Sequence, residues 1–224
     1  DLIEEPQNKR YNFKIRSGVT AKDISAAQAN GTVRNNAMSC PHCGKSTPIS
    51  ALRHDTTDEN GNTVYGLRLW NEAEFEPRTD DIFTERLYAV RYEHIDVLPN
   101  GKTKSTRYYI EPGERENKNE EKIRDNVRDN FVSWQEQGFV PSMPIEEGME
   151  TARLMRERGW KYWHQLFNPR QLLLLSLFAK YTAEANTPLE KAAGILGLNK
   201  CADFNSKLCR WNPNCDKSEQ TFYN

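Results

Sequence analysis

The feature that most constrains this chain is a helix start at residues 168–171 that leads into an apolar run. Asn168 is a favourable N-cap, Pro169 suits the first helical position, and Gln171 stands where its amide reaches back to the cap. Residues 172–178 are apolar on nearly every face of a helix, which predicts burial in a core. The run is shorter than the ~18–20 residues that cross a membrane. We therefore expect a core helix from Pro169 to about Ala185, and no membrane partner.

The rest of the second half is also predicted to be helical. Pro141 and Pro144 interrupt the chain before a helix from about Ile145 to Arg158, which Gly159 ends. A final helix is expected from roughly Pro188 to Cys209. The residues expected to enter a core ahead of these helices are Phe131, Val132 and Trp134.

The first half is predicted to be β-rich. Alternation over residues 88–94, the pair Asn100-Gly101 and residues 106–110 indicate a hairpin with a type I′ turn. Residues 58–62 read as a second hairpin turn, and residues 64–86 as an irregular segment. Shorter strands are expected at 11–15 and 47–52, the latter behind a zinc knuckle.

A charged segment separates the halves. Residues 111–130 hold seven acidic and five basic residues and few apolar ones, which favours a solvated helix or a linker. The predicted organisation is a β-rich region with half a zinc ribbon (1–112), a charged linker or solvated helix (113–130) and a helical region (131–224). The predicted fold class is α+β, with a small zinc-ribbon-like β half followed by a mostly helical half.

Composition limits the function classes. The net charge of −1 excludes nucleic-acid binding driven by overall charge, so any attraction to DNA must come from a local patch. Five cysteines form an odd set without a dense framework, which suits a reducing compartment and a cytoplasmic location. No secretory signal or membrane span is recognisable. Because the sequence begins without methionine and stops within a pattern, we expect a piece of a longer protein.

Cys40-Pro41-His42-Cys43-Gly44 has the shape of a zinc knuckle, in which two thiolates bind one ion and a glycine lets backbone N–H groups approach the sulfurs. Structural zinc needs four ligands, and His42 and the distant Cys201, Cys209 and Cys215 are poor candidates for the other two. Two interpretations stay open: half of a zinc ribbon, with Cys40 and Cys43 as its ligands, or two free thiols in a turn. A redox role is disfavoured because no βαβ pattern surrounds the cysteines.

A basic, aromatic turn lies between residues 151 and 170, with five basic residues and one acidic residue. Basic side chains neutralise phosphates and aromatic faces stack on bases, so the turn is a candidate DNA surface. The alternative is that the aromatic residues anchor the turn to a core and the arginines are solvated. A second, weaker basic run lies between residues 200 and 217. The candidate DNA-binding residues are Arg156, Arg158, Lys161, Trp163, Arg170 and Arg210.

The chain carries no recognisable catalytic machinery. Methyl transfer from S-adenosylmethionine to an amino group of a base uses a glycine-rich turn and an Asp/Asn-Pro-Pro-Tyr/Phe loop, which holds and stacks on the flipped base. The segments Asn168-Pro169-Arg170 and Asn212-Pro213-Asn214 lack the second proline and the aromatic residue. No Ser/His/Asp set, P-loop or His-Glu-x-x-His is visible.

Three segments nevertheless resemble a known family. They are residues 31–44, with Cys40-Pro-His-Cys43-Gly, residues 159–173, with Gly-Trp-Lys-Tyr-Trp-His-Gln-Leu-Phe-Asn-Pro-Arg-Gln-Leu-Leu, and residues 202–211 with Thr221-Phe222. In this order they are similar to the middle of the bacterial and archaeal adenine-specific DNA methyltransferases that contain a zinc ribbon. The likeness runs from about Asn12 to the end.

The resemblance implies an internal region between the cofactor motif and the catalytic Pro-Pro-Tyr loop of a methyltransferase that uses S-adenosylmethionine. It implies that the region engages DNA, while a further cysteine pair ahead of Cys40 completes the family's zinc ribbon. The rival hypothesis is a non-catalytic zinc-knuckle and helical module that docks a protein partner, such as a restriction or phage-defence protein.

Overall fold

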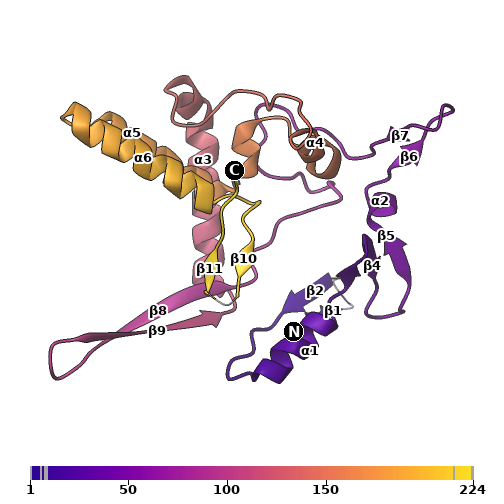
Figure 1. Ribbon diagram of the computed structural model, residues 1–224, viewed down its shortest axis with the longest axis horizontal. Coiled ribbons are helices and arrows are strands. Elements are labelled where there is room, and N and C mark those ends of the chain that lie inside the picture. Colours follow the sequence, from indigo (N-terminus) through magenta and orange to yellow (C-terminus); the bar gives the residue numbers. More distant parts are fainter. Residues whose placement is uncertain (1, 6, 8–9, 214, 223–224) are drawn as a thin grey trace. The chain divides into compact units, whose positions relative to one another are not determined.

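The computed structural model describes residues 2–5, 7, 10–213 and 215–222 (Figure 1). Helices and small antiparallel sheets together confirm the predicted α+β class. The chain divides into two compact units, each built from two separated segments. Unit 1 comprises Asp1–Ser50 and Glu85–Lys118, and unit 2 comprises Ala51–Thr84 and Asn119–Asn224. This differs from the expected division into 1–112, 113–130 and 131–224, because residues 51–84 join the helical unit.

Unit 1 consists of small antiparallel sheets and one short helix. Its longest element is a ribbon in which β8 pairs with β9 along all eight residues of each strand, from Val90 opposite Ile110 to Val97 opposite Thr103. Most side chains of this ribbon are exposed. The elements of unit 1 are β1 (Leu2–Glu5), β2 (Arg10–Phe13), α1 (Ala21–Ala29), β3 (Val33–Arg34), β4 (Ala37–Ser39), β5 (Ser46–Pro48), β8 (Val90–Val97) and β9 (Thr103–Ile110).

The turn of the β8–β9 hairpin is not the predicted type I′ turn. A type I′ turn needs positive φ at both central residues, and Asn100 is not among the residues with positive φ. Instead, the N–H of Gly101 donates to the oxygen of Leu98 (2.9 Å), and the N–H of Leu98 donates to the oxygen of Lys102 (2.8 Å). Gly101 has a φ of 76°. Pro99 restricts its own φ to negative values and so favours this three-residue loop.

The strand predicted at 47–52 is correct only at its start. Strand β5 ends at Pro48, and the short helix α2 (Ile49–Leu52) follows, where unit 1 passes into unit 2. The predicted turn at 58–62 is confirmed between β6 (Thr56–Thr57) and β7 (Thr63–Val64), with the N–H of Asp58 bonded to the oxygen of Asn62 at 2.9 Å.

The charged segment, expected to be either a solvated helix or a linker, forms a helix. Helix α3 (Glu114–Glu136) continues beyond residue 130 and belongs to unit 2 from Asn119 onward. Val127, Phe131 and Trp134 are buried at spacings of four and three residues, so they form one apolar stripe. Val132 is exposed, and its predicted place in the core is wrong because it points to another side of this helix.

The core of unit 2 joins α3 to the irregular segment 65–84 and to the turn at 160–167. Trp70 meets Trp160 edge to face, with ring centroids 6.4 Å apart, and Phe75 lies 5.1 Å from Phe131. The buried apolar residues are Trp70, Phe75, Val127, Phe131, Trp134, Val140, Ile145, Leu154, Trp160, Leu166, Phe167, Leu172 and Leu175.

The helix predicted from Ile145 to Arg158 forms only as α4 (Ala152–Arg158). The N–H of Ile145 bonds the oxygen of Lys161 (2.7 Å), and Pro144 pairs with Tyr162 as an isolated β-bridge, so residues 144–145 stay extended. Gly159 ends the helix as predicted, with a φ of 76° and its N–H bonded to the oxygen of Met155 at 2.9 Å. A 3₁₀ helix, η2 (Trp163–Leu166), follows.

The predicted start of the apolar helix is confirmed. In α5 (Pro169–Ala183), Asn168 Oδ1 accepts the N–H of Gln171, and Gln171 Oε1 accepts the N–H of Asn168, each at 2.9 Å. Burial on nearly every face is wrong. Leu172 and Leu175 are buried, but Leu174 and Tyr181 are exposed, because the core and α6 cover only part of the surface of α5.

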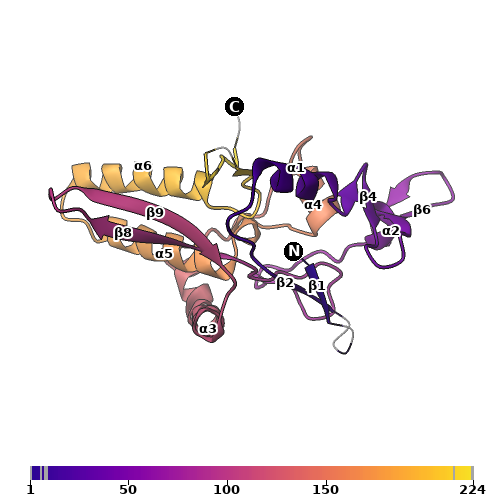
Figure 2. The same cartoon turned by 90° about the horizontal axis from the view of Figure 1, so that it is seen from below.

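Helices α5 and α6 (Pro188–Phe204) run side by side (Figures 1 and 2). A Cβ on Gly194 would lie 2.6 Å from Thr182, and one on Gly197 would lie 3.1 Å from Phe178, so the two glycines permit this close approach. Helix α6 ends at Phe204 instead of Cys209, and the chain then turns into the short pair β10 (Trp211–Asn212) and β11 (Lys217–Ser218).

Candidate nucleic-acid interface

Two of the segments that carry the family resemblance meet in unit 2. The N–H of Lys207 donates to the oxygen of Leu166 at 2.8 Å, and its ammonium lies 4.4 Å from the ring centroid of Trp160. The rings of Trp163 and Phe222 lie 6.3 Å apart. Residues separated by about forty positions or more in the sequence therefore form one packed structure.

The end of α6 binds residues 220–222. The Asp203 carboxylate accepts the N–H groups of Phe222 (3.0 Å) and Thr221 (3.2 Å) and the side-chain amide of Gln220 (3.0 Å). The bond from the Phe222 N–H is the largest of the effects that hold the pKa of Asp203 below its usual value. The Thr221 hydroxyl also contacts Ser206 Oγ (2.7 Å) and Cys209 Sγ (3.2 Å). These bonds give Asp203, Ser206 and Cys209 a structural role.

The aromatic residues of the basic turn mainly serve packing. Trp160 and Phe167 are buried, and Trp163 is half-buried with its ring against that of Phe222. The backbone N–H of Trp163 donates to the oxygen of Met143 at 3.3 Å. Base stacking needs an open aromatic face. The geometry therefore favours the packing alternative for these rings, Trp163 included.

The basic side chains on and just after α4 differ from these aromatic residues. Arg153 and Arg158 are exposed, and Lys161 is half-buried. The guanidinium of Arg156 stacks on Tyr65, 5.6 Å from its ring centroid, and Nη1 of Arg156 lies 3.4 Å from the Tyr65 hydroxyl. Across residues 2–5, 7, 10–213 and 215–222, no carboxylate forms an ion pair with any of these four basic side chains. Arg153, Arg156 and Arg158 lie on α4, and Lys161 lies just after it. We call these four residues the α4 cations.

Tyr65 was missed by the sequence analysis. It lies in the irregular segment after β7 and is exposed beside Arg156, 91 residues away in the chain. No local pattern links two residues so far apart, so only the fold reveals the pair.

The two other candidate arginines lie in separate places. Arg170, at the start of α5, forms an ion pair with Glu120 of α3. The carboxylate compensates the charge of Arg170 and makes it less available to a phosphate. Arg210 is exposed just before β10, and its carbonyl oxygen accepts the N–H of Glu219 at 2.8 Å.

The Cys40–Cys43 segment forms a tight turn closed by backbone hydrogen bonds. The N–H of Gly44 bonds the oxygen of Cys40 (2.9 Å), and the N–H of Cys40 bonds the oxygen of Lys45 (2.9 Å). Hydrogen bonds from the backbone of Cys43 and then of His42 lower the pKa of the Cys40 thiol. Such N–H groups favour a thiolate, the form that binds zinc.

The donor set for zinc is only half present. In the described part of the chain, no group of three or more His, Cys, Asp or Glu side chains is placed to hold a metal ion. Cys201, Cys209 and Cys215 are free thiols of unit 2. Cys40 and Cys43 therefore fit two of the four ligand positions of a structural zinc site.

No family model matches the chain, and neither the curated proteins nor the solved structures give a match. None of the helices described in the structure combines the length and apolar character that a membrane crossing requires. Any statement about function therefore depends on the residues themselves.

Proposed function

We propose that this chain is the internal, DNA-engaging region of an adenine-N6 DNA methyltransferase that uses S-adenosylmethionine. The chemistry would take place on other segments of the same enzyme. The methyltransferase part of the proposal depends on the resemblance of residues 31–44, 159–173 and 202–222. The observation that supports DNA engagement is the set of α4 cations, which have no carboxylate partner in the described structure.

Uncompensated cations suit a DNA phosphate for an electrostatic reason. Each phosphate that a lysine or arginine neutralises releases condensed counterions, which gives binding a steep dependence on salt. In a chain with a net charge of −1, such an attraction has to be local. The stack of Arg156 on Tyr65 also holds one guanidinium in a fixed position. The α4 cations are therefore the segment of unit 2 best suited to contact the backbone of a duplex.

Titration of labelled duplex DNA at two salt concentrations tests this part of the proposal. Arg158→Glu should weaken binding several-fold and lower the slope of log K against log salt by about one or more. Lys191→Glu, on α6, makes the same change of charge at another exposed residue and should leave binding near that of the wild type. Equal binding by wild type and Arg158→Glu would contradict the role of the α4 cations.

A second experiment tests the enzyme class. The complete gene product that contains this region should transfer a methyl group from S-adenosylmethionine to adenine in DNA, and it should carry an Asp/Asn-Pro-Pro-Tyr/Phe loop. A product without methyl transfer to adenine would refute the methyltransferase assignment and leave DNA binding to be judged by the titration.

Exposed apolar side chains favour one alternative, a non-catalytic module that docks a protein partner such as a restriction or phage-defence protein. On α5 and α6, Leu174, Tyr181, Leu189 and Leu196 are all more than half exposed. Large exposed apolar areas often mark protein interfaces. The alternative requires that duplex DNA bind weakly or not at all, so the same titration separates the two functions.

A further inference from the structure

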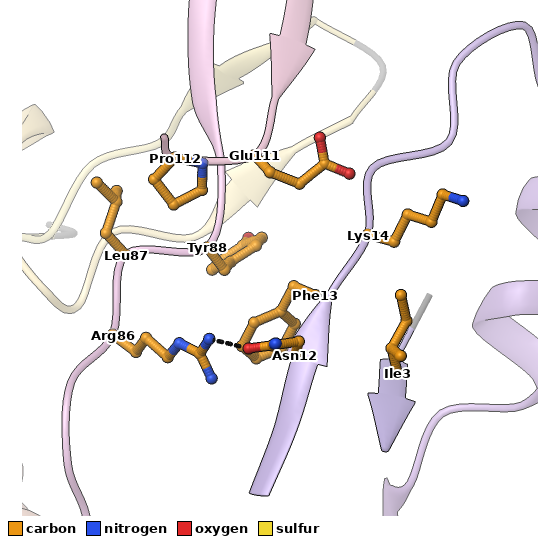
Figure 3. Close-up of a pocket in the computed structure, with 9 residues that line it drawn as sticks. All are labelled: Ile3, Asn12, Phe13, Lys14, Arg86, Leu87, Tyr88, Glu111 and Pro112. Atoms are coloured by element: carbon orange, nitrogen blue, oxygen red, sulfur yellow. Dashed lines mark hydrogen bonds between the residues drawn. The ribbon is translucent and has the colours of Figure 1, made fainter. Parts of the chain in front are cut away.

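Unit 1 contains an open pocket of about 460 Å³ at the base of the β8–β9 ribbon (Figure 3). It is formed by the β1–β2 hairpin and by the residues that directly precede β8 and follow β9. The lining residues that bear on a ligand are Ile3, Phe13, Lys14, Arg86, Tyr88 and Glu111. The volume suits one nucleotide-sized group, since ligand pockets generally measure about 300–1,000 Å³.

Two aromatic rings in this pocket are open to solvent. Phe13 is 36% exposed and Tyr88 58% exposed, with ring centroids 5.4 Å apart and planes inclined by 46°. Figure 3 shows the two rings next to each other in the pocket. These rings differ from the buried aromatics of unit 2, because Tyr88 keeps surface on which a flat ligand can stack.

A fixed guanidinium lies beside the rings. Arg86 donates to the carbonyl oxygen of Tyr11 (2.7 Å) and to the side-chain oxygen of Asn12, and its guanidinium carbon lies 5.3 Å from the Phe13 ring centroid. No carboxylate in the described residues pairs with Arg86. The two bonds hold the side chain, so its positive charge is placed at the edge of the aromatic surface.

Glu111 adds an acceptor. Its Oε1 receives the N–H of Ile15 at 2.6 Å, and this bond is the largest of the effects that lower the pKa of Glu111. The carboxylate is therefore ionised at neutral pH and accepts hydrogen bonds without donating any. In Figure 3 its side chain extends from the end of the ribbon toward the segment that carries Lys14. It favours a ligand with N–H groups and disfavours one that presents only oxygen atoms.

We propose that this pocket binds one unpaired nucleobase that carries an exocyclic amino group, as part of a single-stranded segment of DNA. The base stacks on Tyr88, its amino group donates to Glu111, and the neighbouring phosphate lies near Arg86 and Lys14. A paired base inside a duplex exposes neither face and cannot stack in this way. The β8–β9 ribbon carries the cations Arg91, Lys102, Lys104 and Arg107 against the acids Glu93 and Asp96. Arg107 is paired with Glu93 at 3.7 Å, so the attraction to a polyanion depends mainly on Lys102 and Lys104.

Fluorescence anisotropy of the full chain with a labelled oligodeoxycytidine hexamer tests the stacking. Tyr88→Ala should weaken binding by at least about fivefold, because stacking on one aromatic ring contributes that much or more. Tyr88→Phe keeps the ring and should bind as the wild type does. Tyr181→Ala removes a ring of α5 that is also more than half exposed and should have no effect. Circular dichroism shows whether each variant is folded. Unchanged binding by folded Tyr88→Ala would overturn the proposal.

A second comparison tests the selectivity for an amino group. A 2-pyrimidinone deoxynucleotide hexamer lacks only the exocyclic amine of the deoxycytidine hexamer and keeps a flat ring that can stack. The wild type should therefore prefer the deoxycytidine hexamer, and Glu111→Gln should lose this preference. Equal affinity of the wild type for both hexamers would overturn the role of Glu111. Binding of a proline-rich peptide in place of either hexamer would overturn the nucleobase assignment.

This proposal does not depend on the methyltransferase assignment. Arg158→Glu should alter duplex binding without altering hexamer binding, whereas Tyr88→Ala should do the reverse. Failure of one proposal is therefore distinguishable from failure of the other.

Discussion

The ammonium nitrogen of Lys207 lies 4.4 Å from the ring centroid of Trp160 and 5.0 Å from that of Trp70. Both indoles are buried, and the backbone N–H of Lys207 donates to Leu166 at 2.8 Å. One residue therefore connects the segment after α6 to the turn at Trp160 and to the irregular segment that carries Trp70. Together with the contact between Trp163 and Phe222, it joins two of the three segments with family resemblance.

Removing the charge of Lys207 should destabilise unit 2. Lys207→Met keeps an unbranched apolar stem of similar length but loses the cation, so we expect a loss of about 0.5–2 kcal/mol in the free energy of unfolding. Urea denaturation followed by tryptophan fluorescence measures it. Lys207→Arg retains a cation, so its free energy of unfolding should fall by less than that of Lys207→Met. If Lys207→Met were as stable as the wild type, the cation–π contact would have no energetic role.

Gly159 should be far less replaceable than another glycine with the same backbone conformation. Gly159 and Gly138 have φ angles of 76° and 75°, but a Cβ on Gly159 would lie 2.2 Å from the oxygen of Arg68, whereas one on Gly138 meets nothing within 4 Å. Gly138→Ala should lower the free energy of unfolding by about 1 kcal/mol, the usual penalty for an alanine at positive φ. Gly159→Ala should cost at least ~2 kcal/mol more, since the backbone of residue 68 has to move. Equal losses in urea denaturation would show that the contact with Arg68 relaxes freely.

Local signals in the sequence account for the confirmed parts of the fold. The Asn168–Gln171 cap, the glycine that ends α4 and the β8–β9 pairing each depend on residues a few positions apart. The errors arise where distant contacts decide. Residues 145–151 form no helix because Lys161 and Tyr162 hold residues 144–145 extended. No periodicity within residues 145–158 contains that information.

The candidate site shows the same division. Arginines on α4 are visible in the sequence, but their lack of carboxylate partners, the stack of Arg156 on Tyr65 and the pairing of Arg170 with Glu120 are not. The pocket of Figure 3 joins residues 13, 88 and 111, which no spacing rule connects. Sequence patterns thus indicate which side chains are available, and tertiary contacts decide which remain open to a ligand.

The knuckle should bind zinc weakly in this chain. Cys40 and Cys43 supply two sulfur ligands, and the described residues complete no set of three ligands. A chromogenic chelator should therefore remove zinc from the wild type readily, unlike from a four-ligand structural site. Cys40→Ser should abolish the residual binding, and Cys215→Ser, which changes another exposed segment, should not. Zinc that resists the chelator would show that further ligands exist.

His164 is fully buried, and both of its ring nitrogens face backbone carbonyl oxygens at 3.1 Å, Nδ1 that of Pro141 and Nε2 that of Glu74. Burial lowers the pKa of His164 and is the largest effect. The two carbonyl groups and Glu72 oppose it, and Lys207 adds to it. The ring is therefore neutral in the folded protein at neutral pH. Its single N–H donates to one of the two carbonyl oxygens, and the other ring nitrogen faces a carbonyl oxygen without a proton between them.

Because the pKa of His164 is lower in the folded than in the unfolded chain, the unfolded state binds more protons below about pH 6.5. The contribution of His164 to stability is thus complete above that pH. It declines below that pH until the pH reaches the lowered pKa of the folded state, with a slope of up to about 1.4 kcal/mol per pH unit. Urea denaturation at pH 7.5, 6.5 and 5.5 should show this decline. His164→Gln cannot titrate and keeps one amide donor, so it should start less stable and decline less steeply. Parallel pH profiles for the two proteins would contradict a lowered pKa of His164.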